Sequence, residues 1–270
     1  MLKHRLIPCL FLRNGVLVQS RGFKRYQMLG NPVVAVDRYN QWGVDELIYI
    51  DITPGAYSGL NREDVASPSR NNILDIIRDV SKKCFMPLTF GGGVRTLKDI
   101  GDRLACGADK VTVNTAALDD PKFISEGAKE YGSQCIILSI DVKRAEDGSC
   151  RVVRSGKAMT DLDVIEWAKK AEGLGAGEIF LNSVDRDGSG QGYDLELVRT
   201  VARSVNVPVI ACGGVGNWDH LVEGVRQGEA SAVAAANIFS YKEQSIIEAK
   251  QYLIKSGLNF RPDGAGEGVK

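Results

Sequence analysis

The sequence contains the same pattern twice: a short apolar run is followed by a cluster of glycines and then by a stretch with helical spacing. Gly91–Gly93 follow the run Pro87–Phe90, and Gly213–Gly214 follow the run Pro208–Cys212. Because glycine has no Cβ, backbone N–H groups in such a loop can approach a ligand closely, and the helix that follows presents its positive end. The pattern predicts two anion-binding sites, about half a chain apart.

Polar residues follow other apolar runs and could transfer protons or hold a ligand. Asp141 ends one run, Asn114 and Thr115 follow another, and Asp185–Gly190 form a polar, glycine-rich loop after a third. A carboxylate at such a position can act as a general acid or base, and loops that follow strands are where ligands are held. Ordinary turn chemistry is the alternative interpretation of the loop Asp185–Gly190.

Eight apolar runs must position these residues, and each is short and apolar enough for a strand buried on both faces. They are Leu6–Leu12, Glu46–Ile52, Pro87–Phe90, Lys110–Asn114, Cys135–Asp141, Glu178–Ser183, Pro208–Cys212 and Ala232–Ala236. Helical stretches fall between them, for example at 71–83, 162–175, 195–204 and 218–228. The order predicts an α/β fold, a single (β/α)8 TIM barrel over residues 1–261, with residues 262–270 as a disordered tail.

The repeat extends beyond the glycines and indicates two repeated half-barrels. Asp45–Ile50 resembles Gly177–Leu181, and Asp109–Val113 resembles Ser231–Ala235. Chance similarity between apolar strands is the alternative explanation. A doubly wound open sheet is the alternative fold, but it needs a switch point, usually has fewer strands and does not explain the repeat. In a barrel, the C-terminal ends of the strands carry the active site, where both glycine clusters fall.

Composition excludes several classes of protein. The 34 Lys and Arg residues balance 34 Asp and Glu residues, so nothing indicates binding to nucleic acid or to an acidic membrane surface. No apolar run is long enough to span a membrane. The basic N-terminal stretch lacks the unbroken apolar segment of a signal peptide, so we do not expect one. Six scattered cysteines without a CxxC pair favour a cytoplasmic location. His4 and His220 are the only histidines, and neither ends a strand, so we expect no metal and no cofactor.

Taken together, these stretches resemble the HisF family, the cyclase subunit of imidazole glycerol phosphate synthase in histidine biosynthesis. The resemblance runs from Met1 to about Arg261. It is carried by stretches in most of the strand–helix units, namely Arg5–Leu10, Asp45–Leu47, Asp51–Thr53, Phe90–Gly93, Asp109–Thr115, Ser139–Arg144, Gly177–Glu178, Asp185–Gly188 and Gln191–Asp194.

The resemblance implies a lyase-family synthase subunit that forms a heterodimer with a HisH-like glutaminase, docked on the N-terminal face of the barrel. Ammonia would cross the barrel core and attack a ligand with a phosphate at each end. The resemblance also implies two sets of phosphate-binding residues. The first set is Gly92, Gly93, Asn114 and Thr115, and the second is Gly188, Gly213, Gly214, Ala236 and Asn237. Backbone amides, small residues and helix N-termini suit dianions without Lys or Arg.

The resemblance further implies a charged ring around the ammonia entrance, with the four members Arg5, Glu46, Lys110 and Glu178. Each lies where a predicted strand begins. Two acids and two cations neutralise one another, which allows them to be partly buried. A salt-bridge cluster that only stabilises this face is the alternative, but the presence of all four members favours an ammonia gate.

The match breaks at one of the two aspartates that the family uses for proton transfer, at the ends of strands one and five. Asp141 occupies the strand-five position, but Phe11 occupies the strand-one position and cannot exchange a proton. Gln19 also replaces a lysine that is common on the family's first loop, and the segment 53–72 is longer than usual.

We therefore hypothesise a specialised branch of the family. It resembles the HisF-like proteins of surface-polysaccharide (lipopolysaccharide) biosynthesis, which work with a glutaminase and a separate amidotransferase to place an acetamidino group on a sugar. The barrel would then conduct ammonia and sense a ligand. A genuine cyclase of histidine biosynthesis is the alternative, with Asp51 or Asp187 in place of the missing acid. A non-catalytic regulatory barrel that binds a phosphorylated metabolite is the second alternative.

Overall fold

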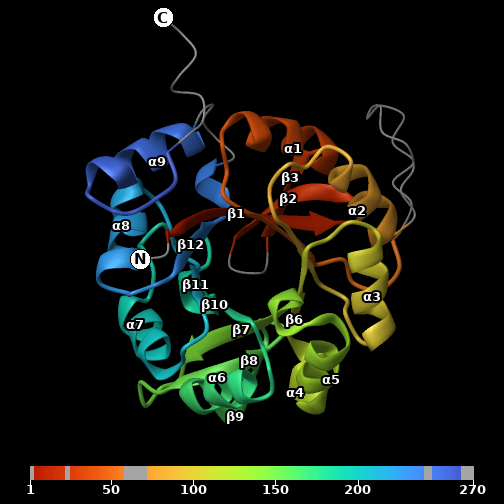
Figure 1. Cartoon of the computed structure of the whole chain (residues 1–270). Helices are drawn as coiled ribbons and strands as arrows, with labels where there is room; N and C mark the ends of the chain where they lie inside the picture. The colour runs from red at the N-terminus through yellow and green to blue at the C-terminus, as the bar shows by residue number, and fades with distance from the viewer. Residues whose placement is uncertain (1–2, 22–24, 58–71, 240–244, 263–270) are drawn as a thin grey trace, which may run out of the picture.

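The computed structural model describes residues 3–21, 25–57, 72–239 and 245–262. Within these ranges, eight parallel strands close into a barrel (Figure 1). In order around the barrel they are β1 (Arg5–Arg13), β4 (Leu47–Asp51), β5 (Leu88–Gly91), β6 (Lys110–Val113), β7 (Ile136–Arg144), β10 (Glu178–Ser183), β11 (Val209–Cys212) and β12 (Ala232–Ala235). Because β12 pairs with β1, the ring of strands is closed. The predicted (β/α)8 barrel is confirmed, and each predicted apolar run overlaps one of these strands.

Helices between the strands cover the outside of the barrel (Figure 1). They are α1 (Pro32–Gln41), α2 (Ile73–Ser81), α3 (Leu97–Ala105), α4 (Thr115–Asp119), α5 (Lys122–Tyr131), α6 (Val164–Gly173), α7 (Leu195–Ser204), α8 (Trp218–Arg226) and α9 (Ser245–Lys255), with 3-10 turns η1 (Ser133–Cys135), η2 (Val184–Arg186) and η3 (Asn237–Phe239). Of the helices in the described ranges, none combines the length and the apolar character that crossing a membrane requires.

Side-chain caps fix where several helices begin. The capping residues each accept a hydrogen bond from a backbone N–H in the first turn of the helix that follows, and they are Asn72, Thr96, Asp163, Asp194 and Asn217. These caps satisfy amides that would otherwise lack a partner. The helices predicted over 71–83, 195–204 and 218–228 correspond to α2, α7 and α8. The helix predicted from residue 162 begins only at Val164, because Asp163 is its cap and ends a strand.

Two predicted features lie largely outside the described ranges. Residues 58–71 of the long segment 53–72 are not described, and neither are residues 263–270 of the predicted tail.

Two antiparallel hairpins extend from the C-terminal ends of β1 and β7, and the sequence patterns did not predict them. The first is β2 (Val16–Arg21) with β3 (Arg25–Gly30), and the second is β8 (Cys150–Arg154) with β9 (Ala158–Asp163). Strands β1 and β7 have nine residues each, against four to six in the other barrel strands, so each continues into its hairpin. Since β1 and β7 open the two halves of the barrel, the hairpins repeat at equivalent positions and support the predicted doubling.

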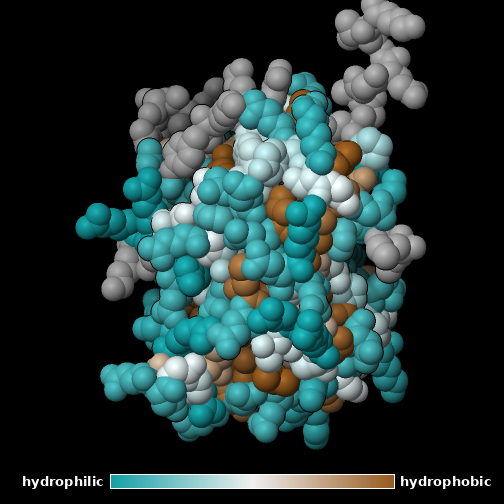
Figure 2. Space-filling model, turned by 90° about the vertical axis from the view of Figure 1, so that its left-hand side faces the viewer, coloured by the Kyte–Doolittle hydropathy of each residue, from teal (hydrophilic) through white to brown (hydrophobic). Residues whose placement is uncertain are grey.

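Side chains alternate along the strands between two cores. Buried residues inside the barrel form one cluster, made of Ile7, Cys9, Ile48, Ile137, Phe180, Ile210, Cys212, Ala232 and Ala234. The intervening residues face the helices. Tyr49 is an example: its ring stacks on Phe90 at 4.9 Å, and its hydroxyl donates to the Pro32 carbonyl at the beginning of α1. Over the described part of the face that carries α7–α9, apolar side chains reach the surface only in small groups among hydrophilic ones (Figure 2).

A buried lysine connects the last helix to the beginning of the barrel. Lys250 of α9 is fully buried, its Nζ lies 2.8 Å from Asp45 Oδ1, and it also donates to the Gly43 carbonyl. Asp45 Oδ2 in turn accepts the Leu6 N–H of β1 at 2.9 Å. The exposed Arg261 approaches Asp45 only to 3.8 Å. Asp45 therefore depends on Lys250 for close charge compensation.

We expect Lys250→Met to lower the free energy of unfolding by about 3–5 kcal/mol, because it leaves the carboxylate of Asp45 buried without its close cation. Chemical denaturation measures this change. Lys255→Met is the matched control, since Lys255 lies on the same helix and is exposed, and its effect should stay within about 0.5 kcal/mol. A loss below about 1 kcal/mol for Lys250→Met would show that the contact does not hold this end together.

Candidate functional site

Asp141 lies at the C-terminal end of the barrel interior with both carboxylate oxygens held. Asn114 Nδ2 donates to Oδ2 at 3.1 Å, and Asn182 Nδ2 donates to Oδ1 at 3.0 Å. The three residues come from the ends of neighbouring strands, and Asn182 pairs directly with Asp141 in the β7–β10 register. Because such pairs share one face of a sheet, the barrel itself aims both groups into the same space.

The pKa of Asp141 is raised above its usual range, mainly because burial disfavours the charged carboxylate. Hydrogen bonds from Asn182 and Asn114 act in the opposite direction, and the negative charge of Asp187 adds to the increase. A carboxyl group that keeps its proton to higher pH than a free aspartate is better suited to exchange protons with a ligand near neutral pH.

Phe11 faces the barrel interior on the side opposite Asp141. In the order of strands around the barrel, β1 and β7 are four places apart, half of the closed ring. Phe11 is half-buried, pairs with Ile50 of β4 and with Val18 of β2, and packs with Ile50 against the inner cluster. The wall that faces Asp141 is therefore apolar at this position.

The predicted first anion site is assembled from the ends of β5 and β6, which are neighbours. Gly92 and Gly93 have positive φ angles of 88° and 65°. A Cβ on Gly92 would lie 1.9 Å from the Asp51 carbonyl oxygen, so only glycine fits there. Asn114 caps α4 without a side-chain hydrogen bond, because its amide is bonded to Asp141. The hydroxyl of Thr115 shares a hydrogen bond with Ser155 of the second hairpin.

The beginning of α3, beside this site, carries a capping box in which Asp99 takes part. Asp99 Oδ2 accepts the backbone N–H groups of Arg95 at 2.9 Å and Thr96 at 2.8 Å. These bonds help to hold the pKa of Asp99 below its usual range although burial acts against them, so the helix terminus already carries a carboxylate. The predicted approach of an anion to this helix end stays a prediction.

The predicted second anion site uses the ends of β10, β11 and β12, which are also neighbours. Gly213 and Gly214 have φ angles of 100° and 98°, and a Cβ on Gly214 would lie 2.2 Å from the Gly192 carbonyl oxygen. Ala236 and Asn237 follow β12 directly. The structure thus brings each of the two predicted sets together at one part of the barrel mouth.

The first hairpin lies over this second set. Asn237 Nδ2 donates to the Ser20 carbonyl at 3.0 Å, and the Ser20 hydroxyl lies 3.4 Å from Asp187 Oδ2. The Cβ position of Gly188 is only 3.1 Å from the Arg21 Cα. Gln19 is buried in this hairpin rather than exposed, and its Oε1 has no hydrogen-bond partner within the described ranges.

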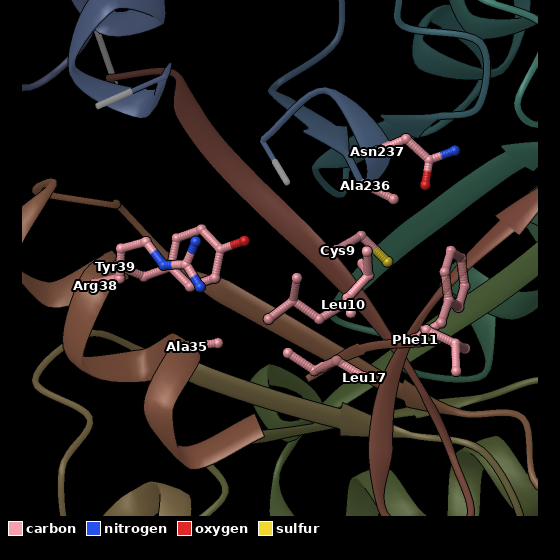
Figure 3. A pocket seen from close by; sticks show the side chains of 11 residues that line it. Cys9, Leu10, Phe11, Leu17, Ala35, Arg38, Tyr39, Ala236 and Asn237 are labelled. Atoms are coloured by element: carbon pink, nitrogen blue, oxygen red, sulfur yellow. The ribbon is translucent and has the colours of Figure 1, made fainter. Parts of the chain in front are cut away.

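A small cavity adjoins Phe11 where β1 separates from β12, beyond their last register pair, Pro8 and Ala235. Figure 3 shows side chains from β1, the first hairpin, α1 and the residues after β12 around it. Its volume of about 60 Å³ has room for a few waters but not for a phosphorylated ligand. Ala236 and Asn237 contribute to its wall, so it borders the second set of glycine-site residues.

At the other end of the barrel, the four predicted ring residues form a closed circuit of alternating charge. Arg5 bonds Glu46 and Glu178 at 2.6 Å each, and Lys110 bonds Glu46 at 3.0 Å and Glu178 at 2.5 Å. Glu46, whose side chain is 1% exposed, also accepts the Thr89 hydroxyl at 3.1 Å. The circuit lies across the N-terminal end of the inner cluster.

Mutual neutralisation keeps Arg5 and Glu178 of this ring ionised. Burial alone would raise the pKa of Glu178, but the hydrogen bonds and charges of Arg5 and Lys110 hold it below its usual range. Burial would likewise lower the pKa of Arg5, and the two glutamates raise it instead. A charge-balanced ring can therefore persist at a position where a single charge would be costly.

Sequence reasoning missed two residues of the mouth. Asn182 could have been found from period two along its strand, because Phe180 and Glu178 also face inward. Arg103 of α3 gave no signal in the sequence, yet it is buried against the first glycine loop.

Of the two acids predicted as replacements at the mouth, Asp51 already accepts two hydrogen bonds from Thr53 and one from the Tyr57 hydroxyl.

Comparisons with known proteins agree with this geometry. A family profile described as "Histidine biosynthesis protein" matches residues 5–245. A protein of Vibrio vulnificus (strain YJ016) described as "Putative imidazole glycerol phosphate synthase subunit hisF2" is 46% identical over 262 residues, which cover 97% of this chain and 92% of the relative.

We expect the side-chain carboxyl of Asp141 to titrate above 3.8 and that of Asp147 below it, because burial dominates at Asp141 whereas two bonds from Ser149 stabilise the charge of the exposed Asp147. Carboxyl ¹³C shifts followed against pH measure both values. Asn182→Ala should raise the pKa of Asp141 further, since one donor to the carboxylate is lost.

The sign of the linked stability follows from the raised pKa. The contribution of Asp141 to the free energy of unfolding is fully present below the unfolded pKa and is lost as pH rises through the higher folded pKa. Asp147 should be unchanged by Asn182→Ala and serves as the internal control. Titration of Asp141 below 3.8 would contradict the account of this site.

Proposed function

The chain belongs to the histidine biosynthesis protein family, and we propose that it is a HisF-like barrel subunit that receives ammonia from a HisH-like glutaminase and delivers it for an amidation reaction. The glutaminase would dock on the N-terminal face, where the charged ring lies, and a phosphorylated ligand would bind at the opposite mouth. The acceptor of ammonia would be the sugar precursor of an acetamidino group in surface polysaccharide, modified by a separate amidotransferase.

One observation carries this proposal: the ring of Arg5, Glu46, Lys110 and Glu178 is complete, whereas the apolar Phe11 faces Asp141, where the resemblance implies a second acid. A subunit that only conducts ammonia needs the entrance and the barrel interior, and it does not need a second acid at the mouth. Loss of a general acid or base typically costs about 10²- to 10⁴-fold in rate. The entrance ring, which ammonia transport needs, is therefore present, whereas the second acid, which cyclisation needs, is missing opposite Asp141.

The barrel interior is suited to neutral ammonia. Thr89, Thr112 and Ser139 pair in register with Ile48, Ile137 and Phe180, which face inward, so these hydroxyls face inward as well. The apolar inner cluster penalises a charged ammonium ion, which would lose its hydration, while the hydroxyls can hydrogen-bond an uncharged molecule. Under this proposal, ammonia released by the glutaminase crosses the interior in its uncharged form.

A genuine cyclase of histidine biosynthesis is the second candidate, and Asp187 is the observation that favours it. The charge of Asp187 acts on Asp141, so a second carboxylate lies near the mouth even though Phe11 is apolar. Asp51 is the weaker replacement because its oxygens are occupied by Thr53 and Tyr57. A regulatory barrel without catalysis, which would only bind the phosphorylated ligand, shares the anion sites but would not need the ring.

Turnover of the bisphosphate cyclase substrate with ammonium salt separates the two candidates. We expect the natural chain to be slow and Phe11→Asp to be faster, by up to about 10²- to 10⁴-fold, because the acid is restored opposite Asp141. Phe11→Asn is the matched control, since it has the same shape as aspartate without the proton. Normal turnover by the natural chain, together with growth of a histidine auxotroph that carries it, would overturn the amidation proposal.

A second prediction concerns the ring. In a reconstituted system of barrel, glutaminase and amidotransferase, Glu46→Gln should reduce glutamine-driven amidation about tenfold or more, while amidation driven by ammonium salt is unchanged. The substitution leaves two cations facing one glutamate, which blocks the entrance without altering the mouth. Glu229→Gln, in an exposed pair with Arg203, is the control and should leave the ratio of the two rates unchanged. If Glu46→Gln and Glu229→Gln gave the same ratio of glutamine-driven to ammonium-driven amidation, the ring would have a purely structural role.

A further inference from the structure

Arg103 carries a buried positive charge directly behind the first glycine loop. Its side chain lies on α3 and the residue is 4% exposed. Nη2 donates to the Gly92 carbonyl at 2.9 Å, and Nη1 donates to the Asp99 carbonyl at 2.9 Å. The Cβ position of Gly93 is 3.8 Å from Nη2, so the guanidinium touches the loop on that side.

Within the part of the chain that the structure describes, this charge has no direct counterion. No carboxylate in the described ranges comes within ion-pair distance of Arg103, and its buried Nε has no hydrogen-bond partner there. Burial lowers the pKa of Arg103, and the more distant charges of Asp99 and Asp51 offset this only in part. A buried cation with carbonyl partners alone is costly, unlike the neutralised ring at the other end of the barrel.

The same contact orients an amide toward the mouth. In a trans peptide, the carbonyl of Gly92 and the N–H of Gly93 point in opposite directions. Because the carbonyl is bonded to Arg103, the N–H of Gly93 points away from α3, and no acceptor in the described ranges takes it. Asp99 bonds the amides of Arg95 and Thr96, just before α3 begins. In the described ranges, an unpaired amide and a buried cation therefore lie on opposite sides of the same peptide group.

We infer that Arg103 is a specificity-determining residue of the first anion site, and that it selects a doubly charged phosphate monoester over singly charged anions. The inference rests on the proposed function, in which Gly92, Gly93, Asn114 and Thr115 hold a phosphate. A dianion at the loop would accept the N–H of Gly93 and would be attracted, across the Gly92–Gly93 peptide group, by the charge of Arg103. A second negative charge gains more from a buried cation than from neutral amides, so the preference depends on Arg103.

Methyl phosphate and dimethyl phosphate test this on the full chain, because the first carries close to two negative charges and the second carries one. Glycine-selective ¹⁵N labelling reports binding at Gly93 and Gly214 separately, so the second site is an internal reference. We expect Arg103→Met to weaken the binding of methyl phosphate at Gly93 about ten- to a hundredfold and to leave binding at Gly214 unchanged. The binding of dimethyl phosphate should weaken much less, and Arg103→Lys should keep most of the preference for methyl phosphate.

The controls separate charge from shape. Lys98→Met removes an exposed cation from the same helix and should change neither site. If Arg103→Met does not fold, the comparison of Arg103→Lys with Arg103→Gln replaces it, and only Arg103→Gln should lose the preference. A role that only positions the loop would weaken both esters equally, and that result overturns the inference while leaving the proposed function intact. Absence of methyl phosphate binding by the natural chain at both glycines would overturn the two together.

Discussion

Closure of eight parallel strands is the constraint on which the rest of this structure depends. A closed barrel turns alternate side chains of every strand into one interior, so residues that begin strands meet at one end and residues that end strands meet at the other. Arg5 and Glu178 are separated by 173 positions in the sequence and still bond at 2.6 Å because β12 returns to β1. The same closure sets Asp141 across from Phe11. Neither arrangement would survive in an open sheet, where these strands would lie far apart.

The parts of this architecture that follow from local pattern were predictable. Eight buried runs, the glycine clusters and the charged starts of strands are each visible in a few consecutive residues, and closure then brings them together. The hairpin β2–β3 was not predicted, because its strands mix apolar and polar residues without a regular alternation, and β2 is held by pairing with the extended end of β1. Arg103 was hidden for a different reason. An arginine on a helix is normally a solvated residue, and only the tertiary fold shows that its guanidinium is buried against Gly92.

The two ends of the barrel solve the problem of buried charge differently. At the N-terminal end, two cations and two anions compensate one another within the chain, so the ring is complete without a ligand. At the mouth, Asp141 is held by two amides and keeps a raised pKa, and Arg103 has only carbonyl partners. Compensation inside the chain gives rigidity, whereas incomplete compensation leaves interaction energy available for a bound molecule. The two halves carry hairpins at equivalent positions, but at the mouth one half presents the aromatic ring of Phe11 and the other the carboxyl of Asp141.

The contact between α9 and the first strand has a consequence for how the chain matures. Asp45 is satisfied on one side by the Leu6 amide and on the other by Lys250, which comes from the last helix. A nascent chain that has emerged only as far as β12 would hold every barrel strand but would still leave Asp45 without its close cation. Synthesis must therefore pass α9 before the beginning of the first strand is fully anchored.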